Sequence, residues 1–280
     1  MFIMHHELFF RGLTPFIISV IFLFSFILSS LKIVSLRKQK TMLRILIFLF
    51  LSAFSVVLSA QNIDDVDVSR KPDGEYVGQY KGVMVSGMVC KGQKTGTWVE
   101  NHANSELPHF IIQYAGNVRD GLFIELDRQG NLLSKAEYKS GLLEGKCMRF
   151  KLSVMTESVC YSNGVKHGPS VICYDKGTKM EEATYKDGKR DGVTLWYYNN
   201  GKEQGGRIAA YNYKDGLFDG IQETYFENGV VSSRKYFKNN VQEGRSLQFY
   251  DDGSLKSMAE YKDGVMVGEE TLYEKGASPR

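Results

Sequence analysis

The sequence has little proline, little cysteine and almost no excess charge. Only 5 of its 280 residues are proline and 4 are cysteine, which excludes a proline-rich or collagen-like chain and a disulfide scaffold. Lysine and arginine number 35 against 32 aspartate and glutamate, and a net charge of +3 is too small to indicate a nucleic-acid partner. Glycine, in contrast, occurs 28 times, and 43% of the residues are hydrophobic. These numbers are typical of a folded chain with many tight turns.

Long apolar runs lie in the first 60 residues. Residues 12–31 contain no charged residue and are long enough to span a bilayer. A second run, residues 45–60, follows Met42 and Arg44 and ends in small residues. This layout predicts a secretory signal peptide that is cleaved before Gln61.

Two interpretations of this leader stay open. In the first, translation starts at Met42, residues 42–60 are the signal peptide, and residues 1–41 are an apolar leader with a mis-assigned start. In the second, residues 1–60 are retained as membrane segments, and membrane contact is limited to this leader. Either way we expect the remainder to be exported, to the periplasm, the outer surface or the medium. Six of the basic residues and one acidic residue lie in the leader, so residues 61–280 carry a net charge of −2.

A repeat of about 24 residues fills residues 76–280, after an expected linker over 61–75. Its clearest copies are Tyr185–Gly192, Tyr213–Gly220 and Tyr261–Gly268, which share the pattern Tyr-Lys-Asp-Gly-x-x-x-Gly. The first glycine position of the pattern holds Gly or Asn in every copy, and these two residues accept a positive φ, so a turn is predicted there. The eight residues at this position are Gly92, Asn117, Gly141, Gly164, Gly188, Gly216, Asn240 and Gly264.

Each repeat is predicted to form one β-hairpin. A second glycine turn follows nine residues after the closing glycine of most copies, although the copy around residues 150–160 lacks it. Between the turns, the third and fifth residues after the closing glycine are mostly apolar and the fourth is more polar, which indicates one apolar and one mixed face. The fold class is therefore all-β: an elongated, single-layer antiparallel β-meander of about eight hairpins.

The repeat unit resembles the bacterial variant of the MORN repeat. The resemblance rests on Tyr-Lys-Asp-Gly-x-x-x-Gly, the aromatic residues that follow it and the Asn-Gly turn, and it covers residues 76–276. Bacterial proteins of this family are often catalogued as antitoxin-like members of toxin–antitoxin systems. The resemblance also implies a protein-interaction scaffold.

The sequence offers no candidate catalytic residue, metal ligand or cofactor site. His167 occupies a repeat position that is acidic in other copies, and no spacing of His, Cys and Glu predicts zinc. No glycine-rich phosphate loop precedes a helix, and no glutamate closes the Asp-Gly turns as a calcium loop requires. We therefore expect a protein that is not an enzyme.

The aromatic columns have two interpretations that stay open. They cover a single-layer sheet that has no second sheet to pack on, or they form a long groove for a peptide, a glycan or a partner strand, which makes them the candidate interaction surface. A lysine ladder at residues 139, 186, 214, 238 and 262 runs beside acidic positions and is expected to be a solvated edge. A cross-strand disulfide among Cys147, Cys160 and Cys173 is compatible with export. The candidate interaction residues are Tyr138, Tyr161, Tyr185, Tyr213, Tyr261, Tyr197 and Tyr225.

The sequence thus predicts an exported, non-enzymatic scaffold with a protein partner and no nucleic acid. Two alternatives stay open. The first is neutralisation of a toxin or effector, which follows from the family resemblance. The second is binding of cell-wall material or another glycan through the aromatic face.

Overall fold

The computed structural model describes residues 61–199 and 206–276, which form one antiparallel sheet of 19 strands and one short helix, α3 (Gln61–Asp64). The predicted leader and signal peptide lie outside the described residues. Within the described part of the chain, no helix has the length and apolar character needed to cross a membrane. The strands are β1 (Gly74–Tyr80), β2 (Val83–Cys90), β3 (Gln93–Asn101), β4 (Pro108–Ala115), β5 (Val118–Leu126), β6 (Leu132–Lys139), β7 (Leu142–Leu143), β8 (Gly145–Lys151), β9 (Val154–Ser162), β10 (Val165–Cys173), β11 (Lys179–Lys186), β12 (Lys189–Arg190), β13 (Gly192–Tyr197), β14 (Arg207–Lys214), β15 (Leu217–Tyr225), β16 (Val231–Lys238), β17 (Val241–Phe249), β18 (Leu255–Lys262) and β19 (Val265–Leu272).

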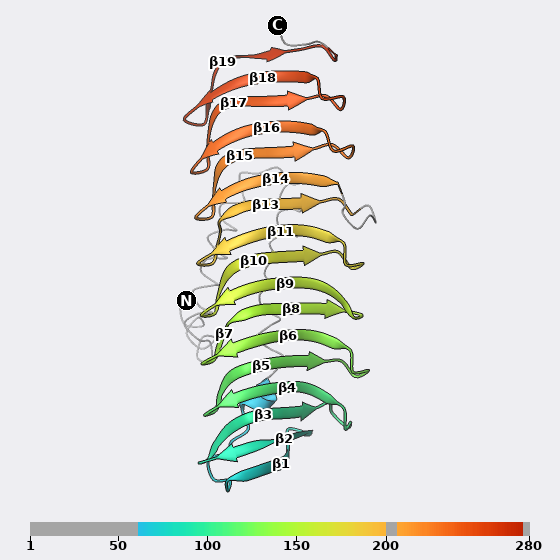
Figure 1. The fold of residues 1–280 in the computed structure, drawn as a ribbon, viewed down its shortest axis with the longest axis vertical. Coiled ribbons are helices and arrows are strands. Elements are labelled where there is room, and N and C mark those ends of the chain that lie inside the picture. Colours follow the sequence, from blue (N-terminus) through green and yellow to red (C-terminus); the bar gives the residue numbers. More distant parts are fainter. Residues whose placement is uncertain (1–60, 200–205, 277–280) are drawn as a thin grey trace, which may run out of the picture. The chain divides into compact units, whose positions relative to one another are not determined.

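Each strand pairs with its neighbours in the sequence, so the sheet is a continuous meander (Figure 1). The short β7 and β12 are continued by β8 and β13, which pair with the same partner strands, β6 and β11. This architecture confirms the predicted all-β class of hairpin repeats.

The outer turns, which contain the first glycine position, confirm the prediction of a positive φ. All eight residues there have φ between +66° and +84°. From Asn117 onward, each of these residues donates its backbone N–H to a carbonyl of the preceding repeat, as in Gly188 to Lys166 at 2.9 Å and Gly216 to Arg190 at 2.8 Å. The same hydrogen bond in successive repeats stacks the turns along one edge of the sheet.

The inner turns, at the other end of the strands, are less uniform, and β3 and β4 are joined by the longer loop 102–107. Four of them place a glycine at φ between +80° and +86°. The hairpin of β8 and β9, in the copy that lacks the glycine, closes at Leu152 and Ser153, with φ of 49° and 64°. Two ordinary residues therefore adopt the left-handed conformation, because the two-residue turn between Lys151 and Val154 requires it.

Burial is deepest on the face that holds the repeat tyrosines, which we call the tyrosine face. The sequence pattern placed the apolar columns at the third and fifth residues after the closing glycine, but the second residue is the most buried. Three members of this column sit opposite small residues, Ala136, Ala183 and Ala259, which are themselves buried. Its buried members are Trp98, Phe123, Ser170, Thr194, Gln222 and Ser246.

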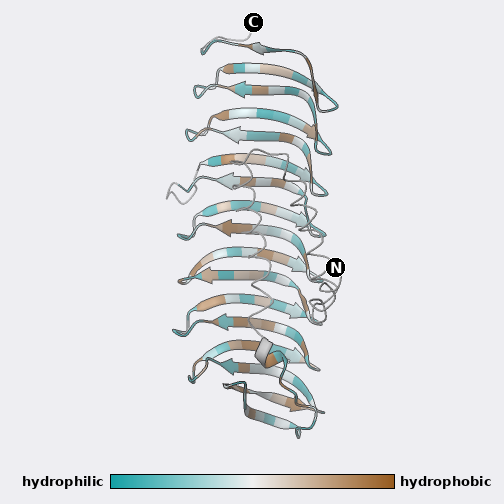
Figure 2. Cartoon of the chain, turned by 180° about the vertical axis from the view of Figure 1, so that it is seen from behind, coloured by the Kyte–Doolittle hydropathy of each residue, from teal (hydrophilic) through white to brown (hydrophobic). Residues whose placement is uncertain are grey.

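Residues 63–73, which we call the strap, were expected to be part of a linker. Instead Ile63, Val66 and Val68 are 0%, 4% and 2% exposed. The strap begins in α3, which lies in front of the N-terminal strands in Figure 2. Six of the seven largest fully buried side chains are Ile63 and residues of β2, β3 and β4. The strap therefore completes a two-layer core at this end of the sheet.

Candidate protein-interaction face

The repeat tyrosines form a column along the tyrosine face, and parts of this column are linked by contacts between aromatic rings. Ring centroids lie 6.0 Å apart for Phe123 and Tyr138, 4.9 Å for Tyr213 and Phe218, and 5.7 Å for Phe218 and Phe237. These distances are within the range of favourable aromatic contacts. The rings stabilise neighbouring repeats and present a half-buried aromatic surface.

The seven predicted tyrosines do not share one face. Tyr138, Tyr161, Tyr185, Tyr213 and Tyr261 belong to the tyrosine face, whereas Tyr197 and Tyr225 belong to the opposite face. The neighbours Glu181 and Glu182 show the difference, because successive strand residues point to opposite faces. Glu181 bonds to Arg190 beneath the tyrosines, and Glu182 accepts the hydroxyl of Tyr197.

Tyr197 and Tyr225 are held by carboxylates on the opposite face. Tyr197 donates to Glu182 at 2.5 Å, and Tyr225 donates to Glu223 at 2.6 Å. Burial and the Glu182 hydrogen bond raise the pKa of Tyr197 to about 12. Glu223 also accepts from Nε of Arg234 at 2.7 Å. These hydroxyls are already occupied within the sheet, which makes this pair a poorer contact surface.

A column of basic residues lies beside the tyrosines, and sequence reasoning missed it. Its members stand two residues after the first glycine position: Lys94, Arg119, Lys166 and Arg190. Their positive groups lie over aromatic rings at 5.2–5.9 Å, which is the geometry of cation–π contacts. The shared repeat position is the signal that would have found these four, although the other copies have Leu143, Phe218, Gln242 and Met266 there.

The tyrosine hydroxyls stay protonated near neutral pH. Burial raises the pKa of Tyr138, Tyr185 and Tyr213 above the usual value, and raises that of Tyr161 to about 12. Arg190 lies among the rings and donates to both oxygens of Glu181 at 2.9 and 3.0 Å. The face therefore combines aromatic surface, neutral donors and fixed cations.

The acidic positions of the repeat have a structural role that the sequence did not indicate. The carboxylate of Asp120 accepts the backbone N–H of Ser140 at 2.9 Å, and that of Glu144 accepts the N–H of Asn163 at 2.7 Å. Each carboxylate thus caps the outer turn of the next repeat. His167, at the same repeat position, instead places Nδ1 3.5 Å from Asp187. The five ladder lysines are all exposed, in agreement with a solvated edge.

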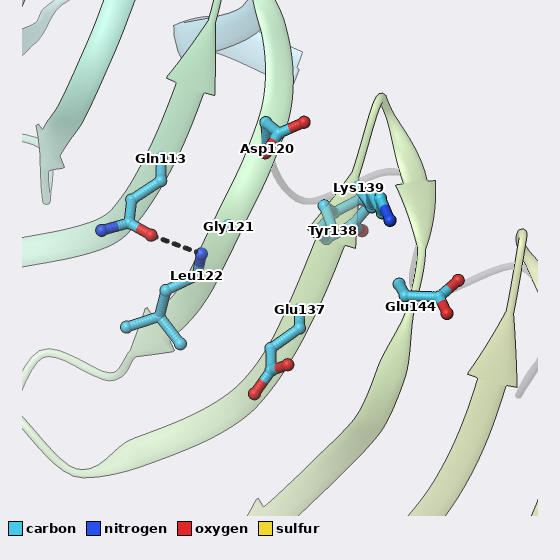
Figure 3. A pocket seen from close by; sticks show the side chains of 8 residues that line it. All are labelled: Gln113, Asp120, Gly121, Leu122, Glu137, Tyr138, Lys139 and Glu144. Carbon is cyan, nitrogen blue, oxygen red and sulfur yellow. Dashed lines mark hydrogen bonds between the residues drawn. The ribbon is translucent and has the colours of Figure 1, made fainter.

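An open hollow lies between successive outer turns (Figure 3). In it, Gln113 accepts the backbone N–H of Leu122 at 2.7 Å. The carboxylates of Asp120 and Glu144 are the turn caps just described, so they are committed to the fold rather than to a substrate. The lining residues are Gln113, Asp120, Gly121, Leu122, Glu137, Tyr138, Lys139 and Glu144.

The four cysteines are free thiols, three of them at least partly buried. In the register of β8 and β9, Cys147 is opposite Val159 and Cys160 is opposite Lys146. Cys147 and Cys160 therefore point to opposite faces, and Cys173 pairs with Lys179 at the far end of its strand. This register gives the predicted disulfide no support. Among residues 61–199 and 206–276, no group of three metal-ligating side chains occurs.

Comparison with known families identifies two of the repeats. Residues 218–239 and 242–263 match the MORN repeat variant. They correspond to β15 with β16 and to β17 with β18, so each matched repeat is one strand–inner turn–strand unit of the sheet. These two repeats are therefore similar to the MORN repeat variant, and repeats of this kind commonly mediate protein or membrane interactions. No curated protein matched the sequence.

Proposed function

We propose that the protein is a non-enzymatic scaffold that binds a protein partner on its tyrosine face. The observation that carries the proposal is the composition of the tyrosine face: half-buried aromatic rings lie along it, and in four of its repeats a fixed cation lies over them. Large aromatic side chains and arginine are the residues that contribute most to protein interfaces. The MORN repeats support the same class of function.

The partner is expected to meet the scaffold in an exported compartment. The support is the leader, in which an apolar run after Met42 and Arg44 ends in Ser59 and Ala60. A C-terminal tag on the full chain allows the protein to be purified and its N-terminal peptide to be weighed. We expect Gln61 as the first residue in a non-cytoplasmic fraction, and retention of residues 1–60 in the cytoplasm would contradict export.

Affinity capture with the tagged full chain tests partner binding. Tyr213→Ala removes a ring from the tyrosine face, and Tyr225→Ala is the matched control on the opposite face. We expect a specific protein to be captured by the unmodified chain and by Tyr225→Ala, but at least fivefold less by Tyr213→Ala. Circular dichroism establishes that both variants are folded, and Tyr261→Ala replaces Tyr213→Ala if the latter is not. Equal capture by both variants would contradict the proposal.

The alternatives have distinct outcomes. Retention on a polysaccharide column that Tyr213→Ala abolishes would favour a glycan ligand. A tight one-to-one complex with a small toxic protein would favour the antitoxin-like role. The structure adds no observation for either, and both stay predictions.

A further inference from the structure

Two places on the tyrosine face share one arrangement of three residues, which we call a cradle. The first cradle is Lys94, Tyr114 and Arg119, and the second is Lys166, Tyr185 and Arg190. In each, the arginine is the register partner of the tyrosine. In each, the lysine Nζ lies over the tyrosine ring, at 5.6 Å in the first cradle and 5.2 Å in the second.

The strap occupies the first cradle with an acidic residue. The hydroxyl of Tyr114 donates to Oδ1 of Asp64 at 2.5 Å, and Nε of Arg119 donates to the same atom at 3.2 Å. Arg119 also forms an ion pair with Asp64, and Lys94 Nζ donates to the Asp64 carbonyl at 2.7 Å. The aliphatic neighbours Ile63 and Val66 are buried. The chain thus shows how this face holds an acidic residue that is flanked by aliphatic ones.

The second cradle has its cations but no such segment among the described residues. Arg190 is paired with Glu181, whereas no carboxylate in residues 61–199 or 206–276 lies within ion-pair distance of Lys166. Arg190 Nη1 is buried and has no acceptor in the same part of the chain. The surroundings are apolar as in the first cradle, with Val159 2% and Ala183 5% exposed. In the second cradle Glu181 already pairs with the arginine, so Lys166 is the cation that has no carboxylate, beside a half-buried tyrosine and an apolar floor.

We propose, resting on the function proposed above, that the second cradle binds a partner-protein segment with the chemistry of the strap. The segment carries an acidic residue between aliphatic residues, and its carboxylate accepts hydrogen bonds from Lys166 and from the hydroxyl of Tyr185. Charge-assisted hydrogen bonds of this kind are stronger than neutral ones and fix the register of the bound segment.

A peptide that copies residues 61–70 is the probe, because it contains the acidic–aliphatic pattern of the strap. Its binding to the purified full-chain protein is measured by fluorescence anisotropy. We expect saturable binding that Lys166→Gln weakens about fivefold to tenfold. Lys146→Gln is the matched control, since Lys146 lies on the opposite face of the adjoining hairpin and is exposed. The peptide with Asp64→Asn is expected to lose affinity to the same extent as Lys166→Gln.

Three results of the peptide experiment would overturn the proposal. They are no binding of the peptide, equal effects of Lys166→Gln and Lys146→Gln on that binding, and binding that depends on Arg119, which would mean that the peptide displaces the strap. A fourth result would also overturn it: a dimer of the protein that Lys166→Gln converts to a monomer, because the second cradle would then bind a second copy of the chain. If Tyr213→Ala abolishes capture of the partner while Lys166→Gln changes neither capture nor peptide binding, this proposal fails and the scaffold function stands. If neither variant changes capture, both fail.

Discussion

At the residue scale, the outer turns depend on one backbone angle. Gly and Asn alternate at the first glycine position because the turn needs a positive φ, and the eight observed values span only 18°. This part of the fold is predictable from the sequence, since local conformational preference alone decides it. The left-handed Leu152 and Ser153 were not predictable, because there the hairpin overrides the preference of the residues.

Replacing the strained pair should stabilise the protein. Leu152 is 83% exposed, so Leu152→Asn with Ser153→Gly removes little buried surface and introduces residues that accept the left-handed conformation. We expect the free energy of unfolding to rise by about 1–2 kcal/mol. Urea unfolding measures it, and Gly188→Ala, at an unstrained turn, should lower the stability instead. A lower midpoint for the double variant would contradict the assigned turn.

The acidic turn caps lead to a second prediction. Glu144→Ala removes the acceptor of the Asn163 N–H and should destabilise the protein by about 1 kcal/mol, whereas Glu144→Gln retains an acceptor and should cost less. Asp175→Ala is the control, because its ion pair with Lys151 is exposed on both sides and contributes little. Equal midpoints for Glu144→Ala and Asp175→Ala would refute a capping role.

At the element scale, the alternation of strand residues decides which side chains act together. The tyrosine column and its repeat spacing were visible in the sequence. The assignment of Tyr197 and Tyr225 to the opposite face was not, because it depends on the register that pairs each closing glycine with an aromatic residue of the tyrosine face, as in Gly192 with Tyr213 and Gly220 with Phe237. The basic column was missed for a related reason: its members became neighbours of the tyrosines only when the register was known.

Strand β4 carries a histidine that should make stability depend on pH. Burial, the neighbouring His102 and the Arg128 charge lower the pKa of His109 to about 4. In the unfolded chain His109 has a pKa near 6.5, so below that pH it binds a proton that the folded protein does not bind. The free energy of unfolding is therefore highest above pH 6.5 and falls as the pH drops toward 4. His109→Gln should reduce the loss between pH 7 and pH 5 by about 1 kcal/mol. An unchanged loss in urea titrations at the two pH values would contradict this account.

At the scale of the whole sheet, the strap decides where the core is. Residues 61–75 were expected to be a linker, between the leader and the repeat. The aliphatic residues Ile63, Val66 and Val68 form a second layer only because the first strands offer a surface on which they pack. Tertiary packing of this kind cannot be derived from the period of the repeat.

The strap therefore has a testable share in stability. Ile63→Ala should cost about 2–4 kcal/mol, because the side chain is fully buried at the two-layer end of the sheet. Val77→Ala, on the exposed side of β1, should change stability by less than about 0.5 kcal/mol. Thermal or urea unfolding compares the two, and a small effect of Ile63→Ala would contradict the described packing.

Lysine footprinting of the captured complex tests most directly the claim that a protein partner binds the tyrosine face. Lys166 lies on that face, and Lys146 lies on the opposite face of the adjoining hairpin. Acetylation rates in the free and partner-bound protein can be compared by mass spectrometry. We predict that the partner slows modification of Lys166 at least threefold and leaves Lys146 unchanged. Protection of Lys146 without protection of Lys166 would contradict the claim.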